Sequence, residues 1–565
     1  MGDPLDPSGP ASFARAVELD EKEEFPSEFI ELLRSLDVHR FLIPREIGGL
    51  LQSFEESLAM LRLIARRDLT AAIAFGQTFL GAIPVWLSGS EGQRHALASS
   101  ISDGELGCLA LTEEAHGGDL MATEFRAAPC ESGYLLSGRK WLINNGAKGG
   151  FASVFAATST EPSFSGFTLF LLDRRRGSVA EGLSPLPRVR THGIRGADIS
   201  GFECRNLRAP QSAVIGSTGR GYEITLKTLQ ISRTMCAALS LGAADTALRA
   251  ALDFALRRRV FGGTVSVIPS ARDQLTGAYA DLLMCDCVAL AAARALDCAV
   301  SRMSVWSSIV KYFVPATTED LVRDAAIVLG ARHYLREGHF SGVFQKAMRD
   351  NAVVGLFDGS SAVNLHIISG QLGALAAGRK RLGATPDSQA AARLRDLFSL
   401  REHPSARGFP RDSDLTFTND GRDEIVEGLS SALQAELPEE IAALLRLLGR
   451  ELERVDRSFE ALREAGDRRV NSSGRFDLVR RYCRISAAAA SVQMWIHNRG
   501  AGDDFFDSGA WLNVILHRIL ARLNPDTPEA PPSTREQLFE QMTAQFERGD
   551  LFSVSSLRLG GTARR

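Results

Sequence analysis

One carboxylate in this chain stands among neighbours that suggest chemistry. Asp358 follows an apolar run and precedes Gly359, Ser360 and Ser361 in the stretch RDNAVVGLFDGSSAVN, residues 349–364. A carboxylate held away from water has a raised pKa and can act as a general base. The same residues also suit a plain D-G turn, with Ser360 capping the helix that follows. From this stretch alone, both interpretations of Asp358 stay open.

The familiar sequence templates for other chemistry are absent. There is no G-x-x-x-x-G-K-[ST] phosphate loop and no G-x-G-x-x-G, and the glycine-rich GSTGRGYE at 216–223 has the wrong spacing to cradle a phosphate. No H-E-x-x-H, no Cys/His set with zinc spacing and no G-x-S-x-G elbow occurs. The sequence therefore predicts no metal site, and any nucleotide site is neither Rossmann-like nor a P-loop.

Four separated stretches of the chain carry a common pattern. They are CLALTEEAHGGD at 108–119, GRKWLINNG at 138–146, LRRRVFGG at 256–263, and LGARHYLREG at 329–338 leading to MRDNAVVGLFDGSSAVN at 348–364. Each motif alone is weak evidence. In order, spacing and helix–β–helix layout, together they resemble the acyl-CoA dehydrogenase superfamily of flavoproteins, over roughly residues 25 to 375.

The resemblance implies FAD as the cofactor and α,β-dehydrogenation of an acyl thioester as the reaction. A carboxylate takes the α-proton while hydride passes from Cβ to flavin N5, so the site must exclude water and stabilise an enolate-like oxygen. In most relatives the base is a Glu in an E-G-T segment. Aligned through Arg349-Asp350, that base is Asp358 here, with Gly359 and Ser360 behind it.

The resemblance also implies which residues hold the cofactor and the substrate. The expected FAD contacts are Leu111, Thr112, Gly117 and Gly118 in a flavin loop, Leu142, Ile143 and Asn144 on a strand, Arg258, Phe261, Gly330 and Ala331 across a subunit interface, and Ser360 and Ala362 after the base. The expected substrate contacts are Gly118, Arg233 and Gly359.

Several positions depart from the family pattern. Gly118 replaces a serine, Leu142 replaces a tryptophan that walls the flavin, and Asn144 replaces a hydroxyl residue, although its amide can still donate to N5. Trp141 stands one residue earlier, and the alternation of a strand places it on the opposite face from Leu142. At the adenosine end, a glutamine and an H-Q pair are missing, and the acid expected three residues before Arg233 is Gln230.

The aspartate itself raises an alternative. Its carboxylate lies roughly 1.5 Å short of a glutamate's from the same backbone, and a misplacement of about 1 Å can slow a reaction on the order of a hundredfold. In the nitroalkane-oxidase branch of the superfamily an Asp serves as the base and O₂ reoxidises the flavin. A flavin oxidase or monooxygenase on the same scaffold is therefore the second interpretation, and a degenerate member without turnover is the third.

Composition narrows the class of protein and its surroundings. The 565 residues are 45% hydrophobic and carry a net charge of −3, which favours a globular protein with a large core and gives no indication of nucleic acid or an anionic membrane as the main partner. Eight scattered cysteines suggest free thiols in a reducing cytoplasm. We expect no signal peptide, and no apolar run that approaches the roughly 20 residues of a transmembrane helix.

The periodicity of apolar residues predicts a mainly α fold with an inserted β domain. The expected units are an N-terminal helical domain at 1–105, a central β-barrel or sandwich at 106–217, a four-helix bundle at 218–376, a linker or surface excursion at 377–423, and a C-terminal helical extension at 424–565. Helical spacing between 438 and 462 predicts an amphipathic helix that packs on the protein's own body, with a membrane or partner surface as the alternative.

The resemblance finally implies partners. The substrate is an acyl thioester of CoA or of an acyl carrier protein, and the electron acceptor is an electron-transfer flavoprotein or O₂. The C-terminal extension resembles that of the long-chain-type members, which implies a homodimer, with a tetramer as the alternative.

Overall fold

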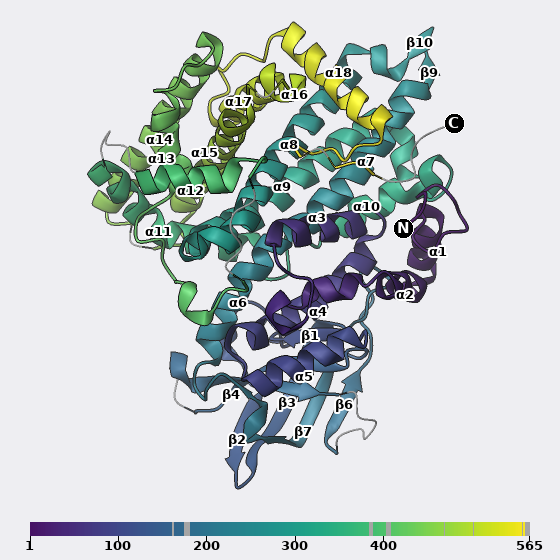
Figure 1. The fold of residues 1–565 in the computed structure, drawn as a ribbon, viewed down its shortest axis with the longest axis vertical. Helices are drawn as coiled ribbons and strands as arrows, with labels where there is room; N and C mark the ends of the chain where they lie inside the picture. Colours follow the sequence, from purple (N-terminus) through teal and green to yellow (C-terminus); the bar gives the residue numbers. More distant parts are fainter. Residues whose placement is uncertain are drawn as a thin grey trace.

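The β domain forms one end of the molecule, and helices from the N-terminal and C-terminal parts of the chain make up most of the rest (Figure 1). The computed structural model describes residues 1–160, 163–174, 181–382, 388–402, 408–467, 469–500, 502–555 and 557–559. The N-terminal helices are α1 (Phe13–Lys22), α2 (Ser27–Ser35), α3 (Phe54–Ala65), α4 (Leu69–Ser88) and α5 (Glu91–Ser102). This order of helices, sheet and helices confirms the predicted fold class.

The β domain forms one eight-stranded sheet. Its strands are β1 (Gly107–Ala110), β2 (Arg126–Cys130), β3 (Gly133–Asn144), β4 (Phe151–Ala157), β5 (Phe167–Asp173), β6 (Leu183–Leu186), β7 (Ile199–Pro210) and β8 (Val214–Ile215). They run in the order β6-β7-β3-β2-β4-β5-β8, and β1 pairs with β4 in parallel. Helix α4 packs on β1 so closely that a Cβ on Gly81 would lie 2.6 Å from the backbone of Cys108. A bare glycine is therefore needed at this crossing.

The bundle follows the sheet. It contains α6 (Gly221–Met235), α7 (Ala237–Arg257), α8 (Pro269–Cys298), α9 (Met303–Leu329), α10 (Val343–Asn351) and α11 (Ser361–Leu382), with a hairpin of β9 (Arg259–Val260) and β10 (Gly263–Thr264) after α7. Proline begins α8, where its missing N–H is not needed. Helix α11 continues six residues past the boundary predicted at 376, so the bundle does not end there.

Three helical stretches are apolar enough, by length and composition, to cross a membrane: Leu69–Ser88, Gly221–Arg257 and Pro269–Cys298. This corrects the expectation that no apolar run approaches that length. In the fold, between 89% and 100% of each apolar window is buried inside the protein, so the core accounts for the apolar composition.

The C-terminal extension packs along α8, α9 and α11 (Figure 1). It contains α12 (Ser388–Phe398), α13 (Glu424–Ala432), α14 (Glu439–Glu464), α15 (Ser473–Asn498), α16 (Asp504–Asp507), α17 (Ala510–Leu523) and α18 (Pro532–Arg548). Helix α12 lies within the predicted linker and buries Leu397 and Phe398, while residues 383–387 and 403–407 of that linker lie outside the described residues.

The amphipathic helix is α14, and the prediction that it packs on the protein itself is confirmed. Its apolar face is buried against α15, α17 and α11. The helix begins after Pro438, which is its N-cap residue, and carries two glutamates in its first turn.

Candidate active site

Asp358 lies in the turn between α10 and α11. Its backbone has a left-handed φ of 54°, and Gly359 follows with a φ of 95°. Aspartate tolerates this conformation better than most residues, and glycine adopts it freely. Arg233 on α6, itself only 4% exposed, donates from Nε to the carbonyl oxygen of Asp358 over 2.9 Å. The turn places Asp358 at the cavity, so the two interpretations of this residue, a D-G turn and a general base, are compatible.

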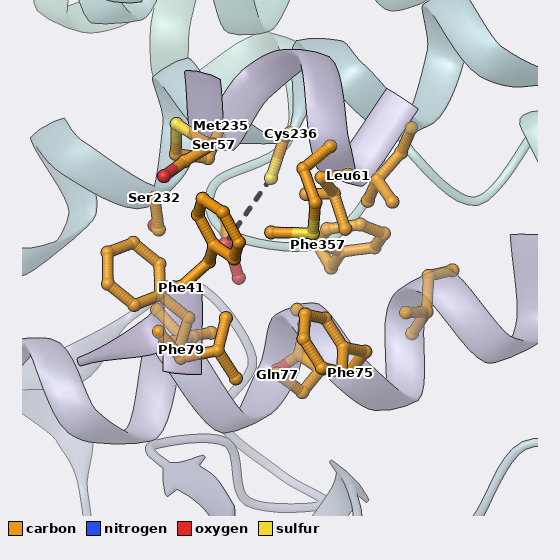
Figure 2. A pocket seen from close by; sticks show the side chains of 17 residues that line it. Phe41, Ser57, Leu61, Phe75, Gln77, Phe79, Ser232, Met235, Cys236 and Phe357 are labelled. Carbon is orange, nitrogen blue, oxygen red and sulfur yellow. Dashed lines mark hydrogen bonds between the residues drawn. The ribbon is translucent and has the colours of Figure 1, made fainter. Parts of the chain in front are cut away.

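The carboxylate of Asp358 lines a cavity of about 40 Å³ between α3, α4 and α6 (Figure 2). The thiol of Cys236 donates to its Oδ2 over 3.5 Å. The walls are mostly apolar, with Phe41, Leu42, Met60, Leu61, Ile73, Phe75, Phe79, Leu80, Met235, Leu239 and Phe357 among the lining residues. A substrate carbon in this cavity would meet the carboxylate in an environment that excludes water.

Electrostatics suit Asp358 to the role of a base. Burial raises the pKa of its carboxyl group above the ordinary value, and the positive charge of Lys311 is the largest effect that opposes the rise. Lys311 is 1% exposed on α9, donates to the carbonyl oxygen of Val354 over 2.5 Å and lies 5.1 Å from the ring centre of Phe357. Burial lowers the pKa of Lys311 in turn. A desolvated carboxylate is a stronger base, and the charge of Lys311 offsets part of the rise in its pKa.

We expect Lys311→Met to move the acid limb of flavin reduction to higher pH. The ionised Asp358 is the active form, so the rate falls as pH drops through its pKa. Removing the opposing positive charge should raise that pKa further. The measurement is the pH profile of the anaerobic flavin-reduction rate. Lys311→Arg, which keeps the charge, should keep the limb in place, and an unshifted limb in Lys311→Met would show that Lys311 does not act on Asp358.

The predicted flavin loop and flavin strand lie together. The carbonyl oxygen of Thr112 accepts a hydrogen bond from the backbone N–H of Trp141 over 3.0 Å. A Cβ on Gly118 would lie 3.8 Å from Val363 of α11, next to the predicted contacts Ser360 and Ala362. Leu111 to Gly118, Leu142 to Asn144 and the start of α11 thus converge beside the turn of Asp358.

A buried ion pair that the sequence reasoning missed anchors this loop. Lys140 on β3 is fully buried and donates to Glu113 Oε1 over 2.7 Å and to the carbonyl oxygen of Leu111 over 2.9 Å. Burial lowers the pKa of Lys140 to about 8. Burial raises the pKa of Glu113, but Lys140 together with the hydrogen bonds from Thr123 and the backbone of Glu124 lowers it on balance. The signal was present in the sequence, because Tyr134, Leu136 and Lys140 share the inward face of a strand with period two.

The structure corrects the expected orientation of Trp141. The register of β3 against β7 shifts between Trp141 and Ile143, and Leu142 has a left-handed φ of 59°. This is a β-bulge, in which two successive residues oppose one on the partner strand. Lys140 and Ile143 are consequently both buried although they stand three apart. Trp141 and Leu142 together occupy the position between them, so simple alternation no longer places them on opposite faces.

The residues present fit an isoalloxazine ring beside this strand. The amide oxygen Oδ1 of Asn144 is buried without a hydrogen-bond partner among the described residues, and Leu142 is 41% exposed. A Cβ on Gly117 would meet nothing within 4 Å, so the loop leaves open space. An unpaired buried amide beside an exposed apolar side chain is what a bound polar ring would satisfy.

The remaining predicted FAD contacts lie elsewhere. Arg258 caps the end of α7 and Phe261 lies in the turn between β9 and β10. This hairpin lies at the opposite end of the molecule from β3 (Figure 1). Phe261 is fully exposed, and Gly330 and Ala331 are exposed at the end of α9. One chain does not bring these residues to the turn of Asp358. This arrangement suits the expectation that they serve a neighbouring subunit.

Three family models match the chain. They are the acyl-CoA dehydrogenase N-terminal domain at residues 12–105, the middle domain at 108–207 and the C-terminal domain at 219–373. A probable acyl-CoA dehydrogenase FadE25 of Mycobacterium bovis is 25% identical over 63% of this chain and 89% of its own length. A cyclohex-1-ene-1-carbonyl-CoA dehydrogenase of Geobacter metallireducens is 27% identical over 62% of this chain and 90% of its own.

One solved structure also covers the C-terminal extension. The acyl-CoA dehydrogenase of Bacillus anthracis, solved in complex with FAD, superposes with a TM-score of 0.70 over 96% of this chain and 89% of its own, at 16% sequence identity. The likeness at this identity is one of fold. With the three domain models in order along the chain, it leads to one conclusion: this chain belongs to the acyl-CoA dehydrogenase family of FAD-dependent oxidoreductases.

Proposed function

We propose that this protein catalyses FAD-dependent α,β-dehydrogenation of an acyl thioester with Asp358 as the base. The observation that carries the proposal is the position of one desolvated carboxylate, which lines a small apolar cavity beside the flavin loop and strand. No metal or nucleophile is needed, because one positioned base suffices to take an α-proton.

The chain's own residues perform the positioning. The turn held by Arg233 places Asp358 at the cavity. Cys236 donates a hydrogen bond to the carboxylate of Asp358 before the carboxylate takes the α-proton. Bound FAD supplies the acceptor for hydride from Cβ, with Leu111 to Gly118, Leu142 to Asn144, Ser360 and Ala362 as the residues that would hold it. Phe41, Phe75 and Phe79 exclude water from the reacting carbons.

The test is anaerobic bleaching of the FAD-loaded protein by short acyl-CoA thioesters. We expect the flavin absorbance to fall on mixing, with an α,β-unsaturated thioester as the product. A flavin that no acyl thioester reduces would contradict the proposed reaction. CoA and carrier-protein thioesters share the reacting carbons, so a difference in bleaching rate between them reflects the carrier. The same assay with both thioesters therefore shows which carrier the protein prefers.

A flavin oxidase is the second candidate, because the base is an aspartate in a left-handed turn rather than a glutamate. Stopped-flow reoxidation of the bleached flavin separates the two. Slow reaction with O₂ and fast reaction with an artificial acceptor supports the dehydrogenase, in which an electron-transfer flavoprotein takes the electrons. Fast reaction with O₂ and release of peroxide supports the oxidase.

We further propose a homodimer in a reducing compartment such as the cytoplasm. Exposed Arg258 and Phe261 would complete the FAD site of a neighbouring subunit. All eight cysteines lie in the described part of the chain, and none is disulfide-bonded there. Sedimentation of the FAD-loaded protein tests the dimer, and a monomer with full FAD content would contradict it.

A further inference from the structure

The cavity next to Asp358 carries two polar side chains that the proposed mechanism does not use. Ser232 and Cys236 lie one helical turn apart beside Asp358, and both, as polar neighbours, lower the pKa of its carboxyl group. Ser57 on α3 and Gln77 on α4 line the same cavity, and they come from the two helices that form its other walls (Figure 2).

Neither Ser57 nor Gln77 is satisfied within the described residues. Ser57 is 4% exposed and its buried hydroxyl has no hydrogen-bond partner there. Gln77 is 8% exposed, and its amide lines the cavity without a hydrogen bond to the described residues, although it is not fully shielded from solvent. Gln93, equally buried on α5, shows the contrast, because its amide bonds to Ser90 and to the carbonyl oxygens of Ser212 and Val214. Buried polar groups normally find partners, so an unpaired hydroxyl and amide in a cavity indicate a group that arrives with the substrate.

The size of the cavity limits what that substrate can be. A water molecule needs on the order of 10–15 Å³ measured in this way, so about 40 Å³ receives roughly three or four small groups. A short acyl group therefore fits, although the extension at the C-terminus resembles that of long-chain-type relatives.

We infer that the substrate is a short acyl thioester with one hydrogen-bonding substituent beyond Cβ, such as a carbonyl, hydroxyl or amide, which Ser57 and Gln77 receive. This inference rests on the proposed function and names the class of its substrate. The two side chains act by selection: a site built around polar groups rejects an isosteric apolar ligand, since that ligand leaves them unpaired.

The test uses two CoA thioesters of equal size. In 4-oxopentanoyl-CoA a carbonyl oxygen takes the place of one methyl group of 4-methylpentanoyl-CoA, and both have free hydrogens on Cα and Cβ. The second-order rate constant of flavin bleaching should be at least tenfold higher for the oxo compound. Ser57→Ala and Gln77→Leu should each lower that ratio severalfold. Ser240→Ala removes an equally buried, unpartnered hydroxyl on α7 outside the cavity and should leave the ratio unchanged.

A second readout separates this inference from the reaction itself. The thioethers 4-oxopentyl-CoA and 4-methylpentyl-CoA cannot be dehydrogenated, and their shifts of the melting temperature of the FAD-loaded protein report binding alone. If both thioesters bleach the flavin equally, or the methyl compound is faster, the inference is wrong while the proposed function stands. If neither bleaches but the oxo thioether gives the larger shift, the inference stands and the proposed reaction is wrong. Absence of both effects overturns both.

Discussion

Asp358→Asn should lower the rate constant of anaerobic flavin reduction by a factor on the order of 10³ to 10⁴, the upper range for removal of a general base. Asparagine keeps the size of the side chain and tolerates the left-handed turn at φ 54°. The backbone carbonyl oxygen of residue 358 still accepts a hydrogen bond from Arg233, so FAD content and thermal stability should stay close to those of the parent protein.

The chain offers a matched control for this variant. Asp420 and Gly421 form a second D-G turn, with φ values of 51° and 72°, away from the cavity. Asp420→Asn should therefore leave the reduction rate unchanged. If Asp358→Asn reduced its flavin at the parental rate, Asp358 would not be the base, and its turn would be its only role.

Asp358→Glu tests the length of the acid, because aspartate is one methylene shorter than the glutamate expected at this position in most relatives. A longer acid in the same turn carries its carboxylate roughly 1.5 Å further into a cavity that Phe357 and Cys236 already confine. We expect reduced activity despite the retained charge. The left-handed backbone at this position gives a physical reason for an aspartate, since short polar side chains occupy that region more readily than long ones.

The sequence singled out Asp358 as the candidate base because the evidence for it is local. Asp358 stands at a fixed distance from Arg349-Asp350 and before a glycine, and both relations survive without knowledge of packing. Lys311 could not be found in this way, because it lies far from Asp358 in the sequence, on α9. Its charge acts on Asp358 only because the fold brings the two side chains together. The bulge at Leu142 was also invisible, because one extra residue in a strand changes the register but not the composition.

The C-terminal extension was predicted as a helical unit, but its end was not. After α18 the chain re-enters the core, where Phe552 is fully buried. The backbone N–H of Phe552 donates to Asp245 over 3.0 Å, and its carbonyl oxygen accepts from Arg62 over 2.6 Å. Such a segment has no periodicity to recognise, since its bonds go to side chains of α3, α7 and α8 rather than to a neighbouring strand.

This tail fixes one wall of the active-site cavity. Arg62 on α3 forms an ion pair with Asp286 over 2.7 Å, and the same carboxylate accepts from Ser553 over 2.5 Å. Ser57 and Leu61 of the same helix line the cavity. The tail thus contacts α3 through Arg62, which does not line the cavity, and no residue of the extension is among the lining residues.

Phe552→Ala is consequently expected to lower the free energy of unfolding by about 3–5 kcal/mol, the usual cost of emptying a buried phenylalanine site. The ring also lies 4.1 Å from the guanidinium carbon of Arg249 and packs edge-on against Tyr279, and both contacts are lost with it. The measurement is a denaturant titration of the FAD-loaded protein.

Phe164→Ala removes a ring that is 67% exposed, and its cost should stay within about 0.5 kcal/mol. Phe552→Leu, which refills most of the volume, should recover the larger part of the loss. Because the tail supports α3, Phe552→Ala should also raise the KM for the acyl thioester more than it lowers the rate of reduction at saturation. A variant that lost stability with an unchanged KM would show that α3 keeps its position without the tail.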